Sequence, residues 1–143
     1  MRKSLLNYLL MLILFVSGTN LGMLSAEETE NEEEPKEELM YYEIEPNILT
    51  FYQGTGRKLG YIVVQVNLAV RGQDNYDLVE LHLPLIQDNL IAFFNQQDKS
   101  IIQPFAEREQ LRQKALASVK AVLLEETGKD ILENLLFTNY VYQ

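Results

Sequence analysis

The chain has 143 residues, one histidine, no cysteine and a formal net charge of −9. The lack of cysteine excludes disulfides and thiolate metal sites, and a single histidine argues against a histidine-built metal site or catalytic triad. Most of the negative charge lies in residues 27–38, and no basic patch offsets it. Because proteins that bind the phosphate backbone of nucleic acids carry such a patch, we expect no nucleic-acid partner.

The first 26 residues predict export. Arg2 and Lys3 form a short basic start, and residues 5–16 form an apolar run of the kind found in signal-peptide cores. Together with a second apolar patch at residues 21–24, the segment is about 20 residues long and could cross a bilayer with its basic end in the cytoplasm. Residues 1–26 are therefore predicted to be an export signal or a transmembrane anchor, and both alternatives export the residues that follow.

Residues 27–38 are predicted to be a disordered acidic linker. They include eight glutamates and no apolar side chain, so their like charges repel one another and keep the segment extended. The remaining residues, 39–143, are enough for one folded domain of roughly 100 residues.

The domain is predicted to be organised around a strand over residues 61–70. Residues 40–44 and 47–52 are expected to be extended, and the glycines of residues 53–58 predict a turn, so a hairpin or meander should precede this strand. Apolar side chains recur along it at every second position, which is typical of a half-buried strand. These side chains are Ile62, Val64, Val66, Leu68 and Val70.

A first helix is predicted over residues 76–95. Asp74 or Asn75 can cap its start, and Pro84 falls on its polar side, where it should kink the helix around the core. The weak alternation of residues 78–83 leaves a strand there as the alternative.

A second, cleaner amphipathic helix is predicted over residues 107–126, with Gly128 in a position to end it. A short apolar cluster precedes this helix. It consists of Ile101, Ile102 and Phe105.

Two polar side chains fall within the apolar arcs of these helices. His82 is expected to be half-buried and hydrogen-bonded to the backbone or to Asn89, with a pH-sensitive switch as the alternative. Arg112 is expected to lay its stem on the core and extend its head to the rim, or to pair with a carboxylate, for which Asp88 is the candidate.

Residues 135–143 predict a final strand, with Phe137 and Val141 on one face and Thr138, Tyr140 and Tyr142 on the other. A terminal strand this apolar must pair in the sheet, most simply beside residues 61–70. The order of the elements indicates an α+β domain, with a small antiparallel or mixed sheet and two or three helices packed on one face.

Several of these segments, in this order, resemble the FliL family of flagellar basal-body proteins. They are Y-Y-E-I-E-P at 41–46, G-T-G-R at 54–57, H-L-P-L-I at 82–86, L-R at 111–112 and L-F-T-N-Y-V-Y-Q at 136–143. The last segment is the most specific. The signature positions are Pro84, Arg112, Phe137, Thr138, Val141 and Gln143.

The resemblance implies a protein anchored in the inner membrane, with a periplasmic domain similar in fold to stomatin and prohibitin. That domain would form a homo-oligomeric ring around the stator proteins MotA and MotB and support torque and motility. Tyr140 and Tyr142 are expected either to pack beneath a helix or to act as contact residues.

Two other functional classes were compared with this one. For an enzyme, carboxylate pairs such as Glu125 and Glu126 are neighbours in sequence, but adjacent helical positions point apart. We therefore assign no catalytic residue, and we expect no cofactor and no small-molecule substrate. The alternative is a soluble periplasmic binding or chaperone module, released when the export signal is cleaved.

Overall fold

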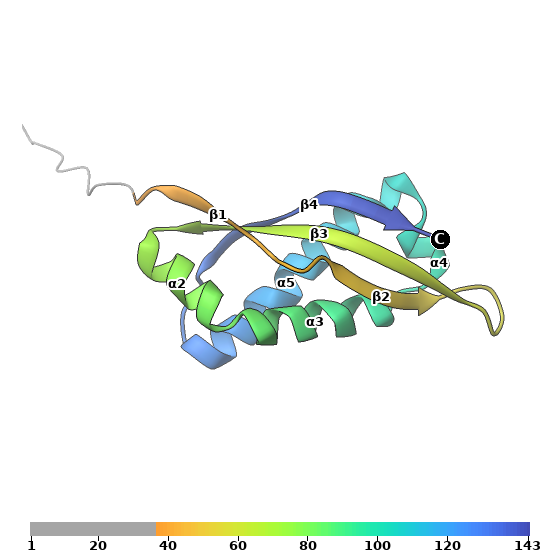
Figure 1. Cartoon of the computed structure of the whole chain (residues 1–143), viewed down its shortest axis with the longest axis horizontal. Coiled ribbons are helices and arrows are strands. Elements are labelled where there is room, and N and C mark those ends of the chain that lie inside the picture. Colours follow the sequence, from red (N-terminus) through yellow and green to blue (C-terminus); the bar gives the residue numbers. More distant parts are fainter. Residues whose placement is uncertain (1–36) are drawn as a thin grey trace, which may run out of the picture. The chain divides into compact units, whose positions relative to one another are not determined.

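The computed structural model describes residues 37–143, so the predicted export segment and most of the acidic linker lie outside the described residues. Figure 1 shows the arrangement of the folded part. In chain order its elements are β1 (Leu39–Glu43), β2 (Ile48–Gln53), β3 (Leu59–Arg71), α2 (Gln73–Leu81), α3 (Leu83–Asn95), α4 (Lys99–Ile102), the 3-10 helix η1 (Phe105–Glu107), α5 (Arg108–Thr127) and β4 (Leu132–Tyr142).

The sheet is antiparallel and is built around β3. β1 pairs with residues 67–71 and β2 with residues 59–64, so they occupy successive stretches of one edge of β3. β4 pairs with residues 62–70 and occupies the other edge. Figure 1 shows β1–β2 and β4 changing sides of β3 along its length, as expected for twisted strands. The predicted hairpin and the predicted pairing of the terminal strand are both confirmed.

One face of β3 forms the centre of the hydrophobic core, as its period-two pattern predicts. The five alternating side chains from Ile62 to Val70 are fully buried. Helices pack on this face through their own apolar stripes, such as Leu90 of α3 and Val119 of α5, which are also fully buried. No described helix covers the opposite face. The α+β class is confirmed, and so is the placement of the helices on one face of the sheet.

The predicted first helix is divided in two at His82. This residue has φ −99° and ψ 14°, outside helical values, and α3 begins anew at Leu83 with Pro84 in its first turn. A proline has no backbone N–H, and its ring clashes with the carbonyl four residues earlier, so the chain breaks here where we predicted a kinked continuous helix. The alternative strand over residues 78–83 is wrong.

The predicted N-cap of the first helix is also wrong. α2 begins after Gly72, whose φ of 76° lies in the left-handed region that favours glycine. Asn75 instead donates from Nδ2 to the backbone oxygen of Arg71, at 2.8 Å. The predicted end of α5 is confirmed, because Gly128 adopts φ 72° and its N–H donates to the oxygen of Leu124 at 2.9 Å.

His82 does not make the predicted hydrogen bond to Asn89. The Asn89 amide oxygen accepts from Ser118 Oγ at 3.0 Å, which joins α3 to α5. Within residues 37–143 the His82 imidazole makes no hydrogen bond. Its half-buried position is confirmed, and its suggested role as a switch stays a prediction.

The apolar cluster predicted before α5 is only partly confirmed. Ile102 is buried against the core, whereas Phe105 is 81% exposed. The reason is that Pro104 is extended, with φ −67° and ψ 131°, which separates α4 from η1 and turns Phe105 outward.

β4 differs from the prediction in which side chains share a face. Phe137 and Asn139 pair with neighbouring residues of β3, so that Thr138 is an extra residue without a partner. This β-bulge puts Phe137 and Tyr140 together on the core side, with ring centroids 5.7 Å apart. Val141 then lies on the opposite face. The predicted grouping assumed an unbroken alternation and is wrong for this reason.

Candidate functional site along the last strand

Most of the signature residues lie on β4 or contact it. Phe137, Thr138 and Val141 belong to this strand, Gln143 follows it directly, and Arg112 of α5 reaches across to it. Pro84 is separate, because it lies in the first turn of α3. The structure therefore brings five of the six signature positions to one strand and its support, and leaves the sixth at the break between two helices.

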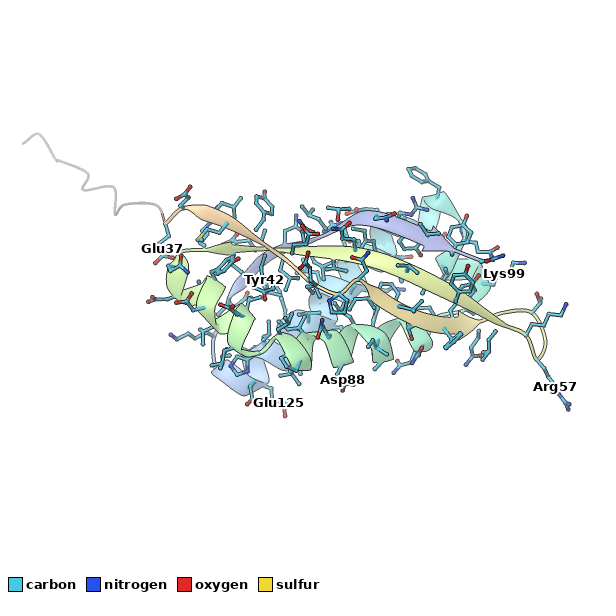
Figure 2. All side chains as sticks on the ribbon, in the orientation of Figure 1. Glu37, Tyr42, Arg57, Asp88, Lys99 and Glu125 are labelled. Atoms are coloured by element: carbon cyan, nitrogen blue, oxygen red, sulfur yellow. The ribbon has the colours of Figure 1, made fainter. Side chains whose placement is uncertain are left out.

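Arg112 fastens α5 to β4. Its Nη1 donates to the Leu135 carbonyl oxygen at 2.8 Å and to the Asn134 amide oxygen at 2.5 Å. Its Nη2 and Nε donate to the two carboxylate oxygens of Glu109, at 2.5 and 2.8 Å. The predicted partner Asp88 is wrong: Figure 2 shows Asp88 on the outer side of α3, pointing away from the strands. Glu109 is preferred because it lies three residues before Arg112 on the same helix.

We expect Arg112→Met to lower the free energy of unfolding by about 1.5–3 kcal/mol, because it leaves half-buried acceptors on β4 without their charged donor. Urea denaturation of the full-length chain in mild detergent measures this. The matched control is Arg71→Met, which removes an ion pair to Glu133 whose side chains are both about half-exposed. That change should cost less than about 1 kcal/mol. Equal losses for the two variants would contradict the bridging role of Arg112.

The bidentate contact also controls the ionisation of Glu109. Hydrogen bonds from Arg112 and then from Gln113 lower the pKa of Glu109 from its ordinary 4.5 to about 2. A carboxyl whose pKa is lower in the folded state contributes stability above its unfolded pKa and loses it as pH falls through the folded value. The affected window therefore runs from about pH 4.5 down to about pH 2.

We expect the difference in unfolding free energy between the native chain and Glu109→Gln to be constant above about pH 5. It should shrink as pH falls from 4.5 and vanish only below about pH 2, where the carboxyl is protonated in both states. Urea denaturation at a series of pH values measures this difference. Repeating the series in an Arg112→Met background is the control, since the donor that lowers the pKa is then gone. A difference that grows on acidification would contradict the assignment.

Tyr140 packs beneath the segment that precedes α5. Its hydroxyl donates to the carbonyl oxygen of Ile102 at 2.8 Å, and the guanidinium carbon of Arg108 lies 4.4 Å from its ring centroid. Burial raises the pKa of Tyr140 to about 12, partly offset by Arg108. A phenol with this pKa stays protonated at neutral pH and serves as a hydrogen-bond donor. Tyr142 is more accessible, at 38% exposed, and its ring lies 6.1 Å from that of Tyr140.

Arg108 also belongs to this group, although the sequence pattern did not single it out. Its guanidinium lies between the rings of Tyr140 and the exposed Phe105, 5.2 Å from the second centroid, which is a cation–π arrangement on both sides. The signal in the sequence was the three-residue spacing from Phe105 to Arg108, which places both on one side of a helical turn.

Gln143, another signature residue, holds the end of β4. The backbone N–H of Gln143 donates to Tyr61 O at 3.0 Å, and the Tyr61 N–H donates back to Gln143 O at 3.1 Å. The Tyr61 hydroxyl also donates to the Gln143 side-chain oxygen. Val141 lies on the sheet face without a helix, where its side chain is 50% exposed. Val141 and Tyr142 are thus exposed side chains on a firmly anchored strand.

The described residues offer two hollows but no metal cluster. One hollow of about 640 Å³ lies between the turn at Gly54–Gly56 and residues 98–104, and a smaller one of about 280 Å³ lies near Pro46 and Ile91. Over residues 37–143 no three His, Asp or Glu side chains gather as metal ligands would. Within the same span, every helix is too short or too polar to cross a bilayer.

Comparison with known proteins identifies the family. The family model described as flagellar basal body-associated protein FliL matches residues 41–143. This match begins within β1 and runs to the last residue, so it includes every described helix and all of β4. No curated protein matches the chain. Since the match covers well over half of the sequence, the chain belongs to the FliL family of flagellar basal body-associated proteins.

Proposed function

We propose that this chain is a non-catalytic accessory protein of the flagellar motor. Its folded domain, residues 39–143, lies in the periplasm, has a fold similar to stomatin and prohibitin, and contacts the stator proteins MotA and MotB to support torque. Residues 1–26 anchor it in the inner membrane, residues 27–38 form an acidic linker, and several copies form a ring. The observation that carries this proposal is the family match over residues 41–143.

The geometry of the last strand supports a role in contact with other proteins. The side chains of Val141 and Tyr142 on β4 are accessible. Arg112 and Tyr140 hold this strand in place. Interface residues presented on a rigid element lose little conformational freedom on binding, and tyrosine is enriched at protein interfaces. We therefore assign Tyr142 as the candidate stator contact and Tyr140 as the residue that positions it.

The test is site-specific photocrosslinking in cells that swim. A photoreactive phenylalanine analogue in place of Tyr142 of the full-length chain should yield an adduct with MotA or MotB. The same analogue at Leu124, a more exposed position on α5, should not. Deletion of the gene should reduce swimming under high viscous load, and the native chain should restore it. Normal motility under load in the deletion strain would contradict the motor role.

A soluble periplasmic binding or chaperone module is the second candidate. The observation that favours it is the hollow of about 640 Å³ beside the turn at Gly54–Gly56, a volume within the range of small-ligand sites. N-terminal sequencing of the mature protein separates the two candidates. A start beyond residue 26 in the soluble fraction would favour the module, whereas an intact start in the membrane fraction would favour the anchored protein.

A further inference from the structure

The sheet face without a helix carries an apolar patch near the β2–β3 hairpin. Five exposed side chains form it, and we call them the open-face patch: Leu49 (62% exposed), Phe51 (59%), Leu59 (69%), Tyr61 (39%) and Val141 (50%). The strand registers place Leu49, Val63 and Val141 in one row across three strands, so the patch is continuous. It presents roughly 500 Å² of side-chain surface, near the upper end of what a monomeric protein exposes.

Charges of opposite sign flank the open-face patch along the strand direction. Exposed Arg57 and Lys58 lie beyond it in the hairpin turn, and Figure 2 shows Arg57 extending from that tip. On the other side lies exposed Glu43, at the end of β1. The Glu43 carboxylate accepts a hydrogen bond from Gln65, which places it about 10 Å from the centre of the patch near residue 62. The basic turn begins at a comparable distance on the opposite side.

We infer that the open-face patch binds a second copy of this chain, in a two-fold pair with the two sheets face to face and β3 antiparallel to its partner. The two-fold axis of such a pair lies between the two sheets, runs across the strands and passes through the centre of the patch. It places the open-face patch of one copy against the same patch of the other. It also brings the basic turn of one copy over Glu43 of the other, so opposite charges meet at both ends of the pair. A parallel arrangement would instead oppose like charges.

The area of the surface fits such a pair. A standard interface buries about 800 Å² on each partner, with an apolar centre and a polar rim. The open-face patch supplies the centre, and the charged residues with Gln65 and Asn139 supply the rim. Two packed sheets lie about 10 Å apart, a distance that the exposed leucine and phenylalanine side chains can fill.

This pair does not depend on the proposed motor role. A two-fold contact closes at two copies, whereas a ring needs a second, heterologous contact elsewhere on the domain. The stator contact assigned above involves Tyr142, which is on the core side of β4. If Tyr142 crosslinks to a stator protein but no two-fold pair forms, the pair is overturned and the motor role stands.

Because the chain has no cysteine, single cysteines introduced into it report contacts without background. In the full-length chain in cells, Leu49→Cys should form a two-copy adduct with a short bis-maleimide, since this position lies near the axis. Leu124→Cys, an exposed leucine on α5, is the matched control and should form no adduct. Retained protease resistance shows that both variants are folded. An adduct of Leu49→Cys with a different protein, or no adduct, would overturn the inference.

The orientation is tested by charge reversal in the Leu49→Cys background. Replacing Arg57 and Lys58 with glutamate should reduce the adduct about tenfold, because three like charges then face one another across each end of the pair. Replacing Glu43 with lysine should reduce it similarly, and combining all three changes should restore it. Failure of the combination to restore the adduct would overturn the antiparallel arrangement.

Discussion

Replacing Gly60 with alanine is expected to lower the free energy of unfolding by about 3 kcal/mol. Gly60 pairs with Tyr52 across the hairpin, and the Tyr52 ring lies over its Cα. A Cβ at this position would come within 2.6 Å of ring atom Cε1. The ring cannot move aside cheaply, because Tyr52 is only 2% exposed and its hydroxyl accepts from Gln103 Nε2 at 2.9 Å. Urea denaturation of the full-length chain measures the loss.

The control for this change is Gly56→Ala in the same hairpin. Gly56 has φ 69° and no atom within 4 Å of an added Cβ, so it should lose only about 1 kcal/mol of backbone preference. A double variant with Tyr52→Ala should cost less than the sum of the two single changes, because the clash is then absent. Strict additivity would show that the ring is not the cause.

Replacing Phe94 with alanine is expected to lower the free energy of unfolding by about 3–5 kcal/mol. Phe94 is fully buried at the end of α3 and lies between two other rings. Its centroid is 5.3 Å from that of Phe93 and 5.9 Å from that of Phe137. The change would open a cavity between α3 and β4 and remove the aromatic contacts of both. Urea denaturation in the same conditions measures the effect.

Phe105→Ala is the matched control, since it makes the same chemical change at a side chain that is 81% exposed. It should cost less than about 1 kcal/mol, most of it from the lost contact with Arg108. If the two variants lost similar stability, the placement of α3 against β4 would be wrong.

The candidate site could be predicted from the sequence only in its outline. The predicted final strand forms and pairs beside β3, and Tyr140 is packed beneath the segment before α5, one of the two alternatives stated for it. The carboxylate partner of Arg112 was open to prediction, because Glu109 lies three residues earlier on the same helix. The contact of Arg112 with Leu135 was not, because it depends on the position of α5 over β4.

The open-face patch likewise could not be predicted from the sequence without the tertiary structure. Leu49 and Phe51 alternate with buried residues in β2, but this strand is apolar on both faces, so its sequence did not indicate which face would be exposed. Val141 joins them only because of the bulge at Thr138, which depends on the pairing of β4 with β3.

By itself, the sequence determined the buried face of β3, the extent of α5 to within one residue at each end, and the stop at Gly128. These features depend on side-chain period and on backbone preference within one segment, which a short stretch specifies alone. The tertiary structure decided the bulge in β4, the face on which Val141 lies and the contact of Arg112 with the strand. Each of these is set by contacts between segments far apart in the chain, and such contacts exist only once the sheet and helices have packed together.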